Sequence, residues 1–139
     1  MSIKYTSKGT ALQKSISSVF TVIAALDTIN YPDETVETVD ISDLGSGVGK
    51  VKGATGYTDG GQASGSGFYD PADTGHKSLN ASLAAPPTAA DQWKINNPDA
   101  GPTAVTFSGW LTKFTPKASV GSFLKFDWQI DLTGVATYP

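Results

Sequence analysis

The clearest pattern in the chain is an alternation of apolar and polar residues near its C-terminal end. From Ser119 to Leu132 the two kinds of side chain keep opposite parities, and only Ser122 and Phe123 break the rule. Successive side chains of a strand point to opposite faces, so the pattern predicts a long strand with one dry and one wet face. The apolar parity holds Val120, Leu124, Phe126, Trp128, Ile130 and Leu132, and the polar parity holds Lys125, Asp127, Gln129 and Asp131 among others.

A second long strand is expected just upstream, at residues 102–115. The connecting residues TPKAS carry the proline and small side chains of a turn, so the two strands are predicted to form an antiparallel hairpin. Shorter β patterns predict further strands at residues 10–14, 19–26, 35–42, 62–69 and 91–96.

One helix is expected, from about residue 71 to about Ala84. Asp70 is suited to cap it, Pro71 fits its first turn, and Asp73 favours the positive end of the helix dipole. Leu79 and Leu83, four residues apart, should face the core. The fold class is therefore mainly β: a β-sandwich or barrel of about seven antiparallel strands with this helix packed on it, in a single domain spanning residues 1–139.

The segment from Asp43 to Gly61 has no such pattern and is predicted to be a long glycine-rich loop. Its sequence is DLGSGVGKVKGATGYTDGG, with Lys50 and Lys52 as its only bases. A structureless loop of this length is uncommon in a small domain and is usually functional or disordered.

Composition narrows the function. The formal charge is −3, from 10 lysines against 13 acids, and arginine is absent. Arginine is the usual bidentate reader of guanine and phosphate, so sequence-specific nucleic-acid binding is not expected. Cysteine is absent too, which excludes disulfides and thiolate metal sites. No apolar segment follows Lys4 and Lys8, so we expect a protein made without secretion, and no window is long enough to span a membrane.

Two motifs are partly similar to known phosphate-binding and metal-binding motifs, but each lacks residues that such a site needs. The loop from Gly45 to Lys50 resembles a phosphate-binding loop, but Leu44 stands where the motif needs glycine and Val51 where it needs Ser or Thr. Asp70, Asp73 and His76 have the spacing D-x-x-D-x-x-H of a possible metal site, yet capping accounts for both acids and a surface position for the histidine. We therefore expect no metal and no cofactor.

Catalysis is not indicated either. Asp127 and Asp131 share one strand face, which is equally typical of a solvated surface. The tryptophans at 93, 110 and 128 could stack on sugars or bases, but Trp128 belongs to the apolar parity. No nucleophile with a paired base stands out, so an enzyme is not expected.

Three stretches carry a resemblance to a known family. They are IAALDTINYPDETVETVDISDLGS from Ile23 to Ser46, FYDPADTGHKSL from Phe68 to Leu79, and a closing hairpin made of FSGWLTKF from Phe107 to Phe114 and the segment from Leu124 to Gly134. In order and spacing the chain resembles the tail tube proteins, or major tail proteins, of long non-contractile-tailed, lambda-like bacteriophages. It departs in the Gly- and Ser-rich strand at 62–68, and we expect no second, immunoglobulin-like domain of the kind some relatives have.

The resemblance implies a structural virion protein. Its copies would form hexameric rings that stack into a hollow tube, through which DNA passes non-specifically into the host. Other partners would be the tape measure, tail terminator and distal tail proteins, and the protein would reside in the virion after assembly in the host cytoplasm. The long loop would reach the next ring through Asp43, Leu44, Lys50, Val51, Lys52, Tyr57 and Asp59.

The resemblance also suggests which face meets DNA. Lys125, Asp127, Gln129 and Asp131 would line the lumen, where a weak negative balance lets DNA slide, because lysines there would bind phosphates by counterion release. A ligand-binding β-sandwich module, such as a virion decoration or adhesion domain, is the alternative, and it would show a cluster of exposed tryptophans.

Overall fold

The computed structural model describes residues 4–6, 8–43, 45, 47, 49–99 and 103–139. The mainly β fold with one helix is confirmed, and this part of the chain forms nine strands where the sequence predicted about seven. The elements are β1 (Ala11–Ile16), β2 (Val19–Val22), β3 (Leu26–Asn30), β4 (Thr35–Asp40), β5 (Lys52–Asp59), β6 (Gln62–Phe68), α1 (Thr74–Ala84), β7 (Asp91–Asn96), β8 (Ala104–Lys117) and β9 (Lys125–Thr137).

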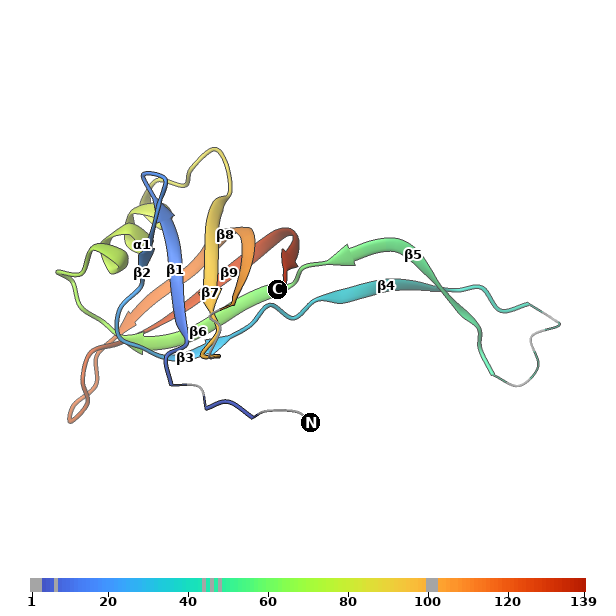
Figure 1. Cartoon of the computed structure of the whole chain (residues 1–139), viewed down its shortest axis with the longest axis horizontal. Helices are drawn as coiled ribbons and strands as arrows, with labels where there is room; N and C mark the ends of the chain where they lie inside the picture. The colour runs from blue at the N-terminus through green and yellow to red at the C-terminus, as the bar shows by residue number, and fades with distance from the viewer. Residues whose placement is uncertain (1–3, 7, 44, 46, 48, 100–102) are drawn as a thin grey trace.

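Seven of these strands make one antiparallel sheet, in the order β2-β1-β7-β8-β9-β6-β3. Strands β1 and β3, near opposite edges of the sheet, contact each other, so the sheet curls around a core (Figure 1). Strands β4 and β5 form a separate two-stranded sheet that projects from this body as a long hairpin. We call residues 35–59 the arm and the rest of the described chain the body.

The predicted C-terminal hairpin is present as β8 and β9, paired from Lys117 and Lys125 onward. It differs from the expectation at its turn, because β9 begins at Lys125 and not near Ser119. Gly121 has φ of 77°, and the amide of Ser122 donates to the carbonyl of Ser119 over 3.1 Å. Glycine is favoured at that turn position because it adopts positive φ without a steric penalty. Val120 fits the apolar parity of the predicted strand, but it lies in this turn and is fully exposed.

Helix α1 starts later than predicted. Its N-cap is Asp73, whose carboxylate accepts from the amide of His76 over 3.1 Å, and the helix begins at Thr74. Asp70 does not cap it; its carboxylate accepts from the amide of Ala72 and closes the turn before the helix. The helix ends at Ala84, as expected before the prolines. On its inner side Leu79 is buried.

The core lies between the curled sheet and α1. Its largest side chains are Trp93, Trp128, Phe126 and Leu12, with Ile130 also fully buried, while Leu83 packs at its edge. The glycines of β6 have a reason in this packing. A Cβ on Gly65 would lie 2.1 Å from the carbonyl oxygen of Thr28 and 2.8 Å from the Trp128 indole. The Gly- and Ser-rich strand therefore lets β3 and a tryptophan approach its backbone.

Two further segments differ from the sequence prediction. The strand expected at residues 19–26 is broken, because Ala25 has φ of 60° and β3 starts anew at Leu26. The predicted loop from Asp43 to Gly61 contains a strand, β5, over Lys52–Asp59. Its pattern was missed because most of β5 is exposed on both faces, so its sequence shows no apolar alternation. Leu44, one of the predicted loop contacts, lies outside the described residues.

Candidate assembly surfaces

The first candidate surface is the outer side of the sheet over β3, β6, β9 and β8. Paired residues of an antiparallel sheet share a face, so the register places the polar parity of β9 beside polar residues of its neighbours. Asp127 pairs with Ser66 and Thr115, and Gln129 with Ser64 and Lys113. We call this set the polar face: Thr28, Asn30, Gln62, Ser64, Ser66, Lys113, Thr115, Lys117, Lys125, Asp127, Gln129 and Asp131.

Charges on the polar face largely neutralise one another. Lys117 forms a salt bridge with Asp127, and Lys125 lies 3.3 Å from a carboxylate oxygen of Asp27 at the edge of the face. A 2.7 Å hydrogen bond from Ser66 Oγ, helped by Lys125, lowers the pKa of the Asp27 carboxyl. The polar face itself holds three lysines and two aspartates, and Asp27 at its edge brings the local balance to zero, whereas β9 alone carries −1. The third pair, Lys113 and Asp131, completes this balance without a salt bridge between them.

A shallow groove of about 360 Å³ runs along the polar face. Thr28, Asn30, Ser64 and Ser66 supply hydroxyl and amide groups, and Lys113 and Asp127 supply charge. These groups can hydrogen-bond to a passing polar chain or to water. Ser66 Oγ already donates to the Asp27 carboxylate, which is held in turn by Lys125.

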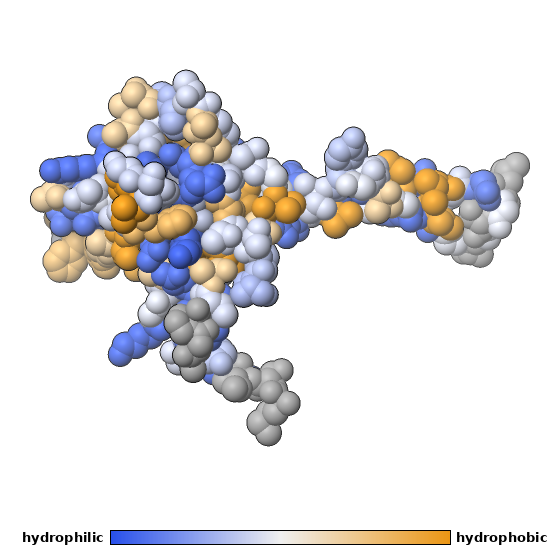
Figure 2. Space-filling model, turned by 45° about the horizontal axis from the view of Figure 1, so that its top comes forward, coloured by the Kyte–Doolittle hydropathy of each residue, from blue (hydrophilic) through white to orange (hydrophobic). Residues whose placement is uncertain are grey.

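The second candidate surface is the arm. Val39 pairs with Gly53, and the amide of Ile41 donates to the carbonyl of Val51, so Val39, Ile41 and Val51 share one face. A Cβ on Gly53 would lie 3.2 Å from Ile41 Cδ1, which shows the isoleucine lying across that strand. Thr38, Asp40 and Lys52 occupy the opposite face. All three apolar side chains of this stripe are exposed, and Figure 2 shows apolar atoms gathered over the outer half of the arm.

The root of the arm is tied to the body by two hydrogen bonds to side-chain carboxylates and one between backbone groups. Asp33 accepts from the amide of Gln62 over 2.7 Å, and Glu34 accepts from the amide of Ala136 over 2.9 Å. The amide of Leu132 donates to the carbonyl of Gly61. The arm therefore leaves the body in a fixed direction, although beyond the root its two strands pair only with each other. Of the other predicted loop contacts, Tyr57 is 73% exposed on β5.

A third surface lies at the turn between β8 and β9. Phe68, Tyr69, Phe123 and Leu124 line an apolar pocket of about 520 Å³. Phe123 is 81% exposed and is held by an edge-to-face contact with Phe68, whose ring centroid lies 6.1 Å away. We call Phe68, Val120, Phe123 and Leu124 the apolar tip. The sequence missed it because Val120 and Leu124 fit the parity of a buried strand face.

The D-x-x-D-x-x-H motif forms a structural junction. His76 is fully buried, in contrast to the expected surface position. Its Nε2 lies 2.8 Å from the carbonyl of Ala24, and its Nδ1 lies 3.0 Å from the amide of Asp70. The neutral tautomer with a proton on Nε2 satisfies both contacts. Within the described residues, no group of three or more His, Cys, Asp or Glu side chains could hold a metal ion.

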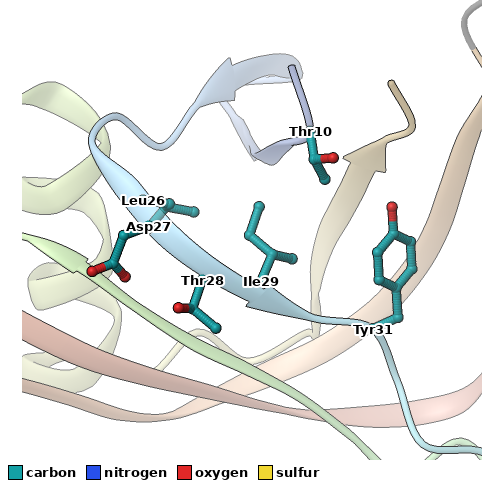
Figure 3. A pocket seen from close by; sticks show the side chains of 6 residues that line it. All are labelled: Thr10, Leu26, Asp27, Thr28, Ile29 and Tyr31. Carbon is teal, nitrogen blue, oxygen red and sulfur yellow. The ribbon is translucent and has the colours of Figure 1, made fainter. Parts of the chain in front are cut away.

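A more enclosed pocket, of about 280 Å³, lies where the curled sheet comes round to β3 (Figure 3). Ile29 of β3 and Tyr31, just beyond its end, lie on the side of Thr10, while Asp27 and Thr28 point the other way. The Tyr31 hydroxyl donates to Asn97 Oδ1 over 2.7 Å, and burial raises the pKa of Tyr31. Because its one carboxylate points away, the pocket offers a gap in the packing rather than a set of reactive groups.

The three tryptophans, all in the described part of the chain, do not form an exposed cluster. Trp93 and Trp128 are buried, and Trp93 Nε1 donates to the carbonyl of Gly109. Trp110 alone is partly exposed, beside Asp131 on the outer side of β8. The arrangement lacks the stacking platform that a sugar-binding module would need. No helix among the described residues is long and apolar enough to cross a membrane.

Comparison with known proteins gives no match by sequence and several by structure. No protein-family model matches the chain, and no curated protein matches it. A chain from the tail of an empty gene transfer agent (GTA) particle, refined with C6 symmetry, is 18% identical, with a TM-score of 0.77 and coverage of 98% of this chain and 99% of that one.

Two other solved structures are similar over nearly all of this chain. A chain of the six-fold symmetrised anti-feeding prophage (AFP) baseplate is 15% identical, with a TM-score of 0.80 and coverage of 99% and 96%. A chain of the SPP1 tail tube is 11% identical, with a TM-score of 0.68 and coverage of 94% and 77%. At these identities the likeness establishes a shared fold.

Proposed function

We propose that this chain is a structural tail protein whose copies form hexameric rings that stack into a tail tube. The arm carries the proposal: a hairpin with an exposed apolar face, fixed at its root and unsupported beyond it, is costly to leave in water. The shared fold supports it, because similar chains come from a C6 tail, a six-fold baseplate and a tail tube. The protein would act in the virion, without enzymatic activity, after assembly in the host cytoplasm.

The type of tail and the partner proteins are proposed from the sequence resemblance. A long, non-contractile, lambda-like tail is proposed on those motifs, and similar folds also occur in an extracellular contractile injection system. Tape measure, tail terminator and distal tail proteins would be the partners at and inside the tube. Electron microscopy of the concentrated protein tests the assembly directly. Rings with six-fold top views, or tubes built from them, are expected; a monomer at every concentration would contradict the proposal.

The arm would join one ring to the next, through the surface that the sequence analysis assigned to a loop. A variant that replaces residues 39–53 with Asn-Gly would join Thr38 to Ala54 by a tight turn and keep the root hydrogen bonds. We expect this variant to fold, because the removed side chains that the structure describes are exposed, and to lose stacking. Tubes of normal length from the shortened protein would exclude this role for the arm.

The polar face would line the lumen. Its balanced charges suit DNA passage, since excess lysine would hold phosphates by counterion release. Changing Asp127 and Asp131 to lysine adds +4 per subunit, and tubes of this variant should bind duplex DNA with a steep salt dependence. The same positions changed to asparagine add +2 without new amines and should bind more weakly. Lysines on the outside of a tube would also bind DNA, so ejection tests the lumen itself: normal DNA ejection at low salt by phage carrying the lysine changes, with tubes intact, would place the face outside the lumen.

A further inference from the structure

The apolar tip is a contact surface without an occupant in the described chain. Val120 is fully exposed at the turn, and Phe123 is the most exposed aromatic of the body. Phe123 lines the pocket at this end of the sheet with Phe68, Tyr69 and Leu124, and Val120 belongs to the same turn, three residues before Phe123. Monomeric proteins rarely leave such side chains together in water unless something binds them.

The arm's apolar stripe and the tip lie at opposite ends of the molecule. In Figure 1 the arm extends to one side of the body, and the turn joining β8 to β9 extends from the other. The root of the arm is fixed, so the two cannot meet within one chain. They can meet between two chains, as a heterologous contact in which the front of one copy meets the back of the next. Contacts of this kind generate closed rings or open filaments.

Charge is complementary between the two ends as well. The arm, residues 35–59, holds four acids and two lysines, a net charge of −2. Residues 113–125 hold three lysines, Lys113, Lys117 and Lys125, and no acid. Lys117 and Lys125 already form salt bridges with Asp127 and Asp27. We therefore expect these lysines to orient an approaching arm more than to strengthen its binding.

We propose that the apolar tip of one copy is the docking site for the arm of another, with Val39, Ile41 and Val51 packed on Phe68, Val120, Phe123 and Leu124. This rests on the proposed function, for which it names the receiving surface. The acidic edge of the arm would lie beside the lysines that border the tip. Each copy then offers one arm and one tip, so the contact repeats along the assembly.

The absence of cysteine from the whole sequence permits a direct test. A chain with Ile41→Cys and a second chain with Phe123→Cys are mixed under assembly conditions and treated with a short bismaleimide, which tolerates small differences in register. We expect a covalent dimer of one chain of each kind. A double variant carrying both cysteines should give a ladder of dimers, trimers and larger species. Ile41→Cys combined with Val19→Cys, an exposed apolar residue of β2, is the matched control and should give no ladder.

A second measurement keeps the proposal separate from the tail tube function. Val120→Ser with Phe123→Ser should raise the protein concentration needed for assembly about tenfold or more, while Phe123→Leu should leave it near wild type. If wild-type tubes form but the cysteines give no ladder and the serine variant assembles normally, the tip is not the receptor and the tube function stands. If the wild-type protein forms neither rings nor tubes, the tube function itself fails.

Discussion

Strands β4 and β9 both carry an apolar face but differ in what covers it. KFDWQID in β9 alternates strictly, whereas in TVETVD of β4 the valines have opposite parities and only Val39 shares a face with Ile41, just beyond the strand. In β9 the apolar parity is buried under α1 and the curled sheet, while every residue of β4 is exposed. The difference teaches that an apolar face needs a cover; the body supplies one for β9, and under the proposed function a second chain would supply one for the arm. Changes in the body should therefore cost stability, and changes in the arm should leave stability alone.

The largest effect is expected from Trp128→Ala. The indole is 2% exposed and fills the space that Gly65 leaves open. Its loss should lower the free energy of unfolding by ~3–5 kcal/mol, measured by urea denaturation. Val39→Ala in the arm is the matched control and should change it by less than ~0.5 kcal/mol. A melting temperature for Trp128→Ala within a degree or two of wild type would mean that this face is not the core.

A smaller contrast is expected between two glycines. Gly65→Ala places a methyl group against the backbone of Thr28 and should cost ~1–3 kcal/mol by overpacking. Gly49→Ala, in the turn of the arm, meets nothing within 4 Å and needs no positive φ, so it should be neutral or slightly stabilising. Thermal melts of the two variants compare them directly. Equal destabilisation by both would contradict the close approach of β3 to β6.

The buried Lys14 should give a pH dependence that the arm lacks. Its Nζ donates to Ser78 Oγ and Ser82 Oγ over 2.8 and 2.6 Å, and burial lowers its pKa although Asp91 opposes the shift. Between that lowered pKa and the ordinary value of 10.5, the unfolded chain binds more protons. The Lys14 contribution to the free energy of unfolding should therefore rise with pH in this window, by at most ~1.4 kcal/mol per pH unit. Below the lowered pKa, the destabilisation caused by burying the charged amine should be fully present.

The comparison for Lys14 uses the variant Lys14→Met. Urea denaturation at pH 8, 9 and 10 should show the wild type gaining stability relative to the variant as pH rises. Burial also raises the pKa of Tyr31 and Tyr138, but both tyrosines are present in both proteins and cancel in the difference. A difference that stays constant over this range would show that Lys14 is protonated equally in the folded and unfolded chain.

The sequence predicted the body well and the arm poorly, for one physical reason. Periodicity reports burial within the chain, so it located the β8–β9 hairpin and the dry parity through Phe126 and Ile130, while the prolines that follow Ala85 located the helix end. It could not locate β5, which is exposed over most of its length, or see that Val120 extends into solvent at a turn. His76 was missed for another reason: its partners, Ala24 and Asp70, are backbone groups, and a sequence does not show which backbone groups a side chain will reach.

Among the free energies of local opening in the monomer, that of the arm should be the smallest. Native-state amide hydrogen exchange measures it strand by strand. Beyond its root, the arm has only the pairing of β4 with β5, and an isolated hairpin is marginal in water. Its amides should exchange close to the unstructured rate, whereas those of β8 and β9 should be slower by more than about three orders of magnitude if the body has a typical stability of ~5 kcal/mol or more.

Assembly should reverse this contrast. In tubes the amides of the arm should become protected, because Val39, Ile41 and Val51 would then be covered and the strands held against a second chain. The protection of β8 and β9 should change little, since their core is complete within one copy. The variant Val120→Ser with Phe123→Ser should leave the exchange of the monomer's arm unchanged and reduce only the protection gained on assembly. Strong protection of the arm already in the monomer would show that the hairpin is stable by itself, and its exposed valines would then need an explanation other than assembly.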